Sequence, residues 1–298
     1  MNSRIGDKQD IPLITIGLLT YNNQSTIDKA LQGLVKQTYS NYELLIFDDC
    51  STDNTVDLIK TFCINYLHVT LHVNKKNLGI MKNFELLLKS IQGEYFFWAC
   101  PDDLYSEKLL SVCFSQLHKT NMVAVLPSVQ LILGNEEYIC NYRNIHLEDF
   151  LMEQQLIIDH VLYKEYNQYC LYWHSLIKSY IIKKCIPFYP NYLSIEEIFP
   201  LFLIMHGGIA TAQEILWSKH QSLVSLKIRN EESYNIAYGF LNKYKCCLVW
   251  AKLYLKSNLT CNLLFIKQIF MYLLFYTYTQ QKSFLYKHFS NIKKLIFS

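Results

Sequence analysis

The chain has 298 residues, of which 51% are hydrophobic and 18% charged; this balance supports a sizeable core and excludes a largely disordered chain. The formal net charge of +3 is too small to argue for nucleic-acid binding. Ten cysteines show neither a CxxC pair nor the Cys/His spacing of a zinc site, so we expect reduced thiols in the core. The polar N-terminus shows no secretory signal and predicts a cytosolic protein.

The first hundred residues alternate between expected strands and helices. Apolar runs predict strands at 11–20, 43–47, 67–73 and 94–99. Helical spacing predicts helices between them, the first capped by Ser25, the second by Thr52 or Asp53, and the third spanning Ile80 to Ile91. This β-α-β-α-β-α-β order predicts a mainly parallel sheet with right-handed crossovers.

The remaining chain gives weaker signals. We expect a helix from Ser106 to His118, a strand at 122–126, a turn at Gly134-Asn135, a helix at 148–164, and a helix from Glu196-Glu197 that stops at Gly207-Gly208. From Tyr234 onward the pattern is helical. Residues 259–279 are the most apolar, but Asn262, Lys267 and Gln268 near their middle favour a packed or interfacial amphipathic helix over a membrane span.

Two apolar runs each end in a pair of acids. Asp48 and Asp49 follow the apolar part of ELLIFDDCSTDNT (43–55). Asp102 and Asp103 follow the apolar part of EYFFWACPDDLY (94–105). Ligands of open α/β sheets bind beyond the carboxyl ends of the strands, so these acids suit a nucleotide held with a divalent cation. The alternative is that both pairs are strand-end turn formers or solvated acids.

Together these motifs resemble the family 2 glycosyltransferases, which have a GT-A fold. The resemblance lies in PLITIGLLTYNNQSTIDKALQGLVKQTYSNYELLIFDDCSTDNTVDLI (12–59), NKKNLGIMKNF (74–84) and GEYFFWACPDD (93–103). It is strong over about residues 11–105 and thin after that. It implies inverting transfer of a sugar from a nucleotide-sugar donor, helped by Mn²⁺ or Mg²⁺.

The resemblance also implies roles for individual residues. Tyr21 would flank the base and Asp49 would accept a hydrogen bond from it, while Asp102 would contact the ribose or the cation and Asp103 would ligate the cation. Further donor-binding candidates are Leu19, Asn22, Asp48 and Asn83. The chain departs from the DxDD pattern of many members, because Cys100 stands where the first acid would be.

A catalytic base is expected at the start of the helix near residue 197. In the family an acid opens a helix after the acceptor-binding region, which points to Glu197, with Glu196 as the second candidate. Two acids at a helix N-terminus also suit the helix dipole without catalysis. EILWSKHQSL (214–223) resembles a family segment, so Lys219 and His220 would reach the diphosphate or the cation. Tyr172-Trp173-His174 would line the acceptor pocket or belong to the core.

We therefore expect an α/β GT-A fold, Rossmann-like and mainly parallel, with a C-terminal helical region. Residues 1–225 would form the glycosyltransferase domain, with a donor half at 11–105 and an acceptor half at 106–225, and 226–298 would be helical. The expected function is transfer from a nucleotide-sugar donor to a glycan or lipid-linked acceptor in cell-surface polysaccharide synthesis such as lipopolysaccharide. The protein would be cytoplasmic, with peripheral contact to the inner membrane face through the C-terminal helices.

Two rival functions stay open at this point. One is a nucleotidyltransferase on a related α/β fold, although such enzymes usually carry a glycine-rich phosphate loop and Thr20-Tyr21-Asn22-Asn23 contains no glycine. The other is a catalytically degenerate relative that serves as a membrane-associated scaffold, which Cys100 and the apolar C-terminus favour.

Overall fold

The computed structural model describes residues 11–133, 136–140, 144, 169–185, 199, 202–204 and 206–221. The chain divides into two compact units, one formed by 1–191 and 195–229 and the other by 192–194 and 230–298. All described residues belong to the first unit. The helices expected at 148–164 and beyond residue 234 lie outside the described residues. Among the described helices, none is long and apolar enough to cross a membrane.

The N-terminal half forms a parallel sheet with a helix after each of its first three strands, as predicted. Its four neighbouring strands lie in the order β3-β2-β1-β4. The elements in chain order are β1 (Ile14–Thr20), α1 (Ile27–Leu34), β2 (Tyr42–Asp48), α2 (Thr55–Asn65), β3 (Val69–Val73), α3 (Ile80–Ser90) and β4 (Tyr95–Ala99).

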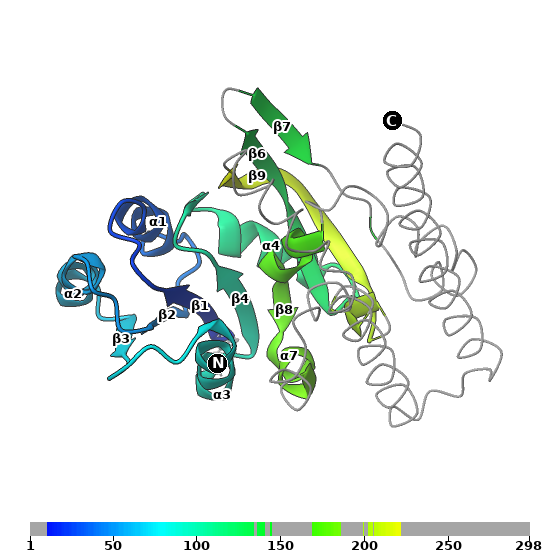
Figure 1. Cartoon of the computed structure of the whole chain (residues 1–298). Coiled ribbons are helices and arrows are strands. Elements are labelled where there is room, and N and C mark those ends of the chain that lie inside the picture. The colour runs from blue at the N-terminus through cyan, green and yellow to red at the C-terminus, as the bar shows by residue number, and fades with distance from the viewer. Residues whose placement is uncertain are drawn as a thin grey trace, which may run out of the picture. The chain divides into compact units, whose positions relative to one another are not determined.

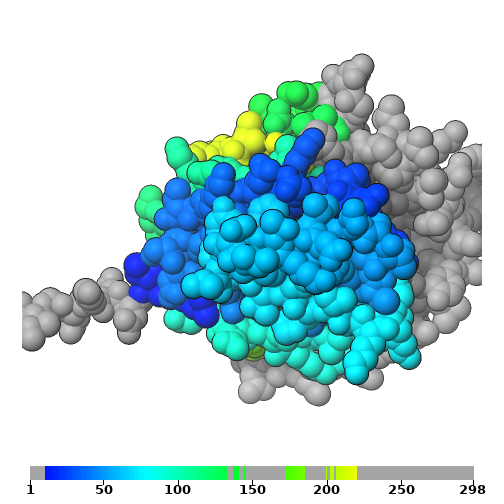
Figure 2. Space-filling view, turned by 90° about the vertical axis from the view of Figure 1, so that its left-hand side faces the viewer, coloured from blue at the N-terminus to red at the C-terminus, as the bar shows by residue number. Residues whose placement is uncertain are grey.

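Helices cover both sides of this sheet. Helices α1 and α2 contact each other on one side, and α3 lies on the other side together with α7 (Ser179–Cys185) (Figure 1). Gly17 in β1 allows α3 to pack closely, because a Cβ there would lie 2.5 Å from Leu87 and 2.7 Å from Phe96. The surface at the β3 edge is formed by segments of the N-terminal half (Figure 2).

The expected helix starts were slightly wrong. Helix α1 starts after Thr26 rather than Ser25, and α2 starts after Asn54, with no side-chain hydrogen bond from either cap residue. Asp53 still serves the start of α2, because its Oδ1 accepts hydrogen bonds from the amide (3.0 Å) and hydroxyl (2.5 Å) of Thr55.

The sheet continues beyond β4 with strands that the sequence mostly did not predict. The path runs β4-β8-β6-β9-β5, with β7 paired to β6, so the sheet is mixed. Only β6 was expected, and it is longer than residues 122–126. The further elements are β5 (Asp103–Tyr105), α4 (Leu109–His118), β6 (Ala124–Leu133), β7 (Glu136–Cys140), the 3₁₀ helix η1 (Tyr169–His174), β8 (Leu176–Lys178) and β9 (Ile209–Gln221).

Three further expectations can be compared with the described residues. Helix α4 begins after Lys108, not at Ser106. Leu133 lies opposite Glu136 in the β6–β7 ladder, while the turn expected at Gly134-Asn135 lies outside the described residues. Phe202–Ile204 are helical and the helix ends at two glycines with positive φ, Gly207 (141°) and Gly208 (91°), as predicted.

Candidate functional site

Three loops meet at the carboxyl edge of the parallel strands. Because β2, β1 and β4 are neighbours and run in the same direction, the residues that follow them emerge at the same edge. These residues are Tyr21–Gln24 after β1, Asp49–Asn54 after β2, and Cys100–Asp102 after β4. The acids at the ends of β2 and β4 therefore lie at one side of the sheet, with the β1 loop between them.

The loops after β1 and β2 are joined by hydrogen bonds. The amide of Asn22 donates to Ser51 Oγ (2.9 Å), and Asn22 Oδ1 accepts from the amide of Thr52 (2.8 Å). Asn22 and Cys50 have positive φ, 53° and 64°, which tight loops require. The side chain of Asn22 thus holds the β2 loop in place.

Tyr21 is the aromatic side chain that this arrangement leaves at the surface. Its side chain is 47% exposed, while its amide donates to Asn23 Oδ1 at 2.9 Å. Leu19, two residues earlier, is half-buried in β1 opposite Phe47 of β2. An exposed ring on a fixed backbone is suited to stacking on a flat ligand.

Asp48 is buried and shapes its own loop. Its Oδ1 accepts from the amide of Ser51 (2.8 Å), and its Oδ2 accepts from the hydroxyl of Ser51 (2.5 Å). The carboxylate is therefore engaged within the β2 loop.

Asp49 organises the turn before α3. Its Oδ1 accepts from the amide of Leu78 (2.7 Å) and from Asn74 Nδ2 (3.0 Å), and its Oδ2 accepts from the amide of Gly79 (2.9 Å). Burial favours the neutral acid, but the hydrogen bonds outweigh it and hold the pKa of Asp49 below 3.8. Asn83 completes the network, since its Nδ2 donates to the carbonyl of Gly79 at 3.0 Å. Asn83 also hydrogen-bonds the Asp49 carboxylate and helps to lower its pKa.

The two acids after β4 lie in different surroundings. Asp102 is exposed, whereas Asp103 is fully buried in β5, opposite Lys219 of β9. Lys219 Nζ lies 3.6 Å from Asp103 Oδ2, an ion-pair contact that is too long for a hydrogen bond, and neither carboxylate oxygen has a hydrogen-bond partner among the described residues. Burial raises the pKa of Asp103 to about 7, with Lys219 opposing the shift and Asp102 adding to it.

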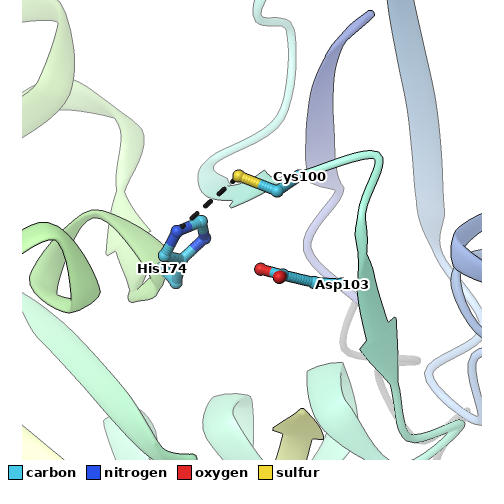
Figure 3. Close-up of side chains that lie close together, drawn as sticks. All are labelled: Cys100, Asp103 and His174. Carbon is cyan, nitrogen blue, oxygen red and sulfur yellow. Dashed lines mark hydrogen bonds between the residues drawn. The ribbon is translucent and has the colours of Figure 1, made fainter. Parts of the chain in front are cut away.

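Cys100 and His174 complete a cluster around Asp103, and their side chains point toward one another (Figure 3). One ligand atom from each of the three residues lies within 4.8 Å of the others. His174 is buried, its ring packs on Trp217 at 4.3 Å, and burial, together with Lys219, lowers its pKa to about 3, so the imidazole is neutral. The hydroxyl of Tyr105 accepts from the amide of Cys100 at 2.6 Å and fixes the loop.

The sequence did not predict this cluster. Cys100 was noted only as a departure from the acidic pattern, and His174 as a residue of an acceptor pocket or of the core. No local spacing identifies the pair, because the two residues are 74 positions apart and meet through the pairing of β4 with β8.

Three residues expected in the site lie outside the described residues or are described only by their backbone. Glu196 and Glu197 lie outside the described residues. The backbone of His220 lies in β9 next to Lys219 and opposite Ile132 of β6.

Comparison with known proteins gives a consistent family. The profile described as Glycosyl transferase family 2 matches residues 15–180, more than half of the chain. The chain is 26% identical over 216 residues to a processive diacylglycerol beta-glycosyltransferase of Mycoplasma pneumoniae, covering 69% of this chain and 61% of that protein. It is 27% identical over 150 residues to the E. coli glucosyltransferase WfgD, which is named for UDP-Glc and a GlcNAc-diphosphoundecaprenol acceptor, covering 50% of this chain and 55% of that protein.

Solved structures show the same fold. S. aureus TarS in complex with UDP-GlcNAc superposes with a TM-score of 0.55 at 16% identity, over 70% of this chain and 58% of that chain. The mannosyltransferase PcManGT from Pyrobaculum calidifontis, in complex with GDP-Man and Mn²⁺, superposes with a TM-score of 0.51 at 15% identity, over 71% of this chain and 57% of that chain. The chain thus spans little more than half the length of these proteins.

Proposed function

Since the chain belongs to glycosyl transferase family 2 and has its α/β fold, we propose that it transfers a sugar from a nucleoside diphosphate sugar to a glycan or lipid-linked acceptor. The observation that supports this proposal most directly is the meeting of three loops at the edge of β1, β2 and β4, where Tyr21 and Asp102 are exposed. The relatives that act on diphosphoundecaprenol-linked sugar and on diacylglycerol favour a role in surface polysaccharide or glycolipid synthesis.

Donor binding would use the loops after β1 and β2. Tyr21 stacks on the base, and Leu19 and Asn22 shape the backbone on which it stands. Asp49 would accept a hydrogen bond from the base, while Asn83 and the amide of Gly79 keep that carboxylate in place. Asp48 supports the loop through Ser51.

The acids after β4 fit a divalent cation. Asp103 offers a buried carboxylate without a hydrogen-bond partner among the described residues, and Asp102 beside it is exposed toward the ligand edge. A bound Mn²⁺ or Mg²⁺ would neutralise the charge of the departing diphosphate. Asp102 and Asp103 would hold it, with His220 as a further ligand, and Asp102 would also orient the ribose.

Glu197 would take the proton of the acceptor hydroxyl, with Glu196 as the second candidate. A carboxylate near that hydroxyl makes it a better nucleophile as the bond to the anomeric carbon forms. Because the hydroxyl attacks in line opposite the leaving diphosphate, the configuration of the sugar inverts. This step takes place at the inner face of the cytoplasmic membrane if the acceptor is lipid-linked.

The test is an assay of nucleoside diphosphate release and sugar transfer. The full chain is incubated with UDP- and GDP-sugars, undecaprenol-linked or diacylglycerol acceptors, and each divalent cation. We expect release with at least one donor, and its loss in Glu197→Gln and Asp102→Asn but not in Asp57→Asn, which changes an exposed acid on α2. Nucleotide binding without release in any combination would favour the degenerate relative that Cys100 suggests, and absence of both would refute the proposal.

A further inference from the structure

The half-buried Cys100 and the buried Asp103 and His174 together offer a thiol, an imidazole and a carboxylate to one point. The three residues come from the loop after β4, the start of β5 and the end of η1, and each side chain faces the other two (Figure 3). Because β4 pairs with β8 directly after η1, and β5 pairs with β9, the sheet itself holds these segments together.

The imidazole of His174 is oriented as a ligand. Its Nδ1 lies 2.9 Å from the carbonyl oxygen of Trp98, which can only accept, so Nδ1 carries the proton. The unprotonated Nε2 therefore faces Cys100 Sγ at 3.8 Å. Metal-binding histidines typically donate their second ring N–H to a carbonyl or carboxylate in this way.

The carboxylate of Asp103 supplies the independent second observation. It is fully buried, and neither of its oxygens has a hydrogen-bond partner among the described residues. A buried carboxylate in such surroundings calls for a cation. Lys219 Nζ forms an ion pair with Asp103 Oδ2 at 3.6 Å but leaves the hydrogen-bonding sites of both carboxylate oxygens open among the described residues.

We propose that Cys100, Asp103 and His174 bind one thiophilic divalent cation of the Zn²⁺ class. A sulfur–nitrogen–oxygen donor set suits zinc, whereas Mg²⁺ and Mn²⁺ prefer oxygen ligands. With bonds of about 2.0–2.3 Å, tetrahedral ligand atoms lie about 3.3–3.8 Å apart, so the cluster needs only small side-chain movements to close on the ion. The thiol releases its proton to water as the ion binds.

This inference deepens the proposed function. The binding of the ion does not depend on that function, and only the use of the ion in sugar transfer rests on it. Asp103 is the acid that the two have in common. The departure of Cys100 from an acidic pattern then becomes a change in ion preference, from an oxygen-only set toward zinc, rather than a loss of the site.

The test measures metal binding without any substrate. The full chain is stripped with a chelator and titrated with Zn²⁺ in competition with a chromophoric chelator, and Co²⁺ loading is followed by its thiolate-to-metal charge-transfer absorption. We expect one equivalent of Zn²⁺, a Co²⁺–thiolate band, and preference for Zn²⁺ over Mn²⁺ and Mg²⁺.

Variants identify the ligands. Cys100→Ser should abolish the Co²⁺–thiolate band and weaken Zn²⁺ binding by more than about 100-fold, because even the loss of an outer partner costs about 10- to 100-fold. Cys63→Ser, which changes a half-buried free cysteine on α2, is the matched control and should change neither. Cys100→Asp should lower the preference for Zn²⁺ over Mn²⁺, and thermal unfolding confirms that each variant is folded.

The outcomes separate this inference from the proposed function. Zinc binding that is unchanged in Cys100→Ser, or the absence of a Co²⁺–thiolate band in the wild type, overturns the inference even if nucleotide sugars are turned over. Zinc bound with the expected variant pattern supports it even if no donor is used, in which case only the proposed function fails.

Discussion

Lys219 and Asp103 face each other across the β5–β9 ladder, with Lys219 Nζ 3.6 Å from Asp103 Oδ2. The lysine side chain retains 13% exposure and the aspartate none. Removing the lysine ammonium group leaves an ionised Asp103 buried without its partner, a change that destabilises proteins by about 3–5 kcal/mol when a pair is fully buried. In chelator-treated protein at about pH 9, where Asp103 is ionised because its pKa in the wild type is about 7, we expect Lys219→Met to lower the free energy of unfolding in urea by about 3 kcal/mol.

The control for Lys219→Met is an ion pair at the surface. Lys60 Nζ lies 2.9 Å from Asp57 Oδ1, with side chains 60% and 75% exposed. Lys60→Met should change the free energy of unfolding by less than about 1 kcal/mol. Equal effects of the two substitutions would show that the buried pair stabilises the fold no more than the exposed pair.

Asp49→Asn should destabilise the turn before α3. The amide keeps the size of the side chain but places an NH₂ group at one of the two positions where the amides of Leu78 and Gly79 donate. We expect a loss of about 1–3 kcal/mol in urea unfolding at neutral pH. Asp57→Asn, at an exposed acid, should remain near the wild type; an unaffected Asp49→Asn would mean that the hydrogen bonds to Asp49 are dispensable.

The same carboxylate gives a pH dependence with a definite sign. The folded pKa of Asp49 lies below its usual 3.8, so the folded state favours the charged form. Its contribution to stability is present above about pH 4 and is lost as the pH falls through the folded pKa. The difference in unfolding free energy between wild type and Asp49→Asn should therefore shrink between about pH 5 and pH 3. A difference that grows on acidification would contradict this.

Tyr21→Ala should weaken nucleotide binding without changing stability. Stacking of a base on an aromatic ring is worth about 1–3 kcal/mol by alanine substitution, which is a loss in affinity of about 5- to 150-fold. Tyr138 on β7 has the same exposed fraction, 47%, and Tyr138→Ala serves as the control. Calorimetric titration with UDP and GDP measures the nucleotide affinity of both variants. Equal affinities of the wild type and Tyr21→Ala would show that Tyr21 does not contact the nucleotide.

Gly33→Ala should disturb the packing of α1 against β5. A Cβ at Gly33 would overlap the carbonyl oxygen of Tyr105, in the strand that carries Asp103. We expect a loss of about 1–3 kcal/mol on thermal unfolding, as for overpacked cores. Gln32→Ala, at the neighbouring exposed position of the same helix, should be tolerated; a stable Gly33→Ala would mean that α1 can move away without cost.

The donor half was largely predictable because its strands are long, apolar and separated by helices of ordinary length. The pairing of β1 with β2 and β4 follows from that order, and it brings Asp49 and Asp102 to one edge. The short strands β5 and β8 have three residues each and depend on their partners, so no local pattern identifies them. Strand β9 does not alternate, because its buried residues 209–212 and 216–217 are separated by the exposed residues 213–215, so no local pattern identifies it.

The candidate site was also predictable only in part. Acids at strand ends are visible in sequence, but the burial that separates Asp103 from Asp102 depends on β9, a distant segment. The contact of His174 with Cys100 depends likewise on the pairing of β4 with β8. The roles of Glu197 and Glu196 stay a prediction.

The most direct test of the account is calorimetric titration of UDP and GDP into the full chain, with and without a divalent cation, for the wild type and Asp102→Asn. Asp102 is exposed, so the substitution should leave the fold intact. We expect cation-dependent binding of at least one nucleotide to the wild type and binding at least about tenfold weaker to Asp102→Asn, a difference of about 1.4 kcal/mol. Absence of binding by either nucleotide, or equal affinity for both proteins, would contradict it.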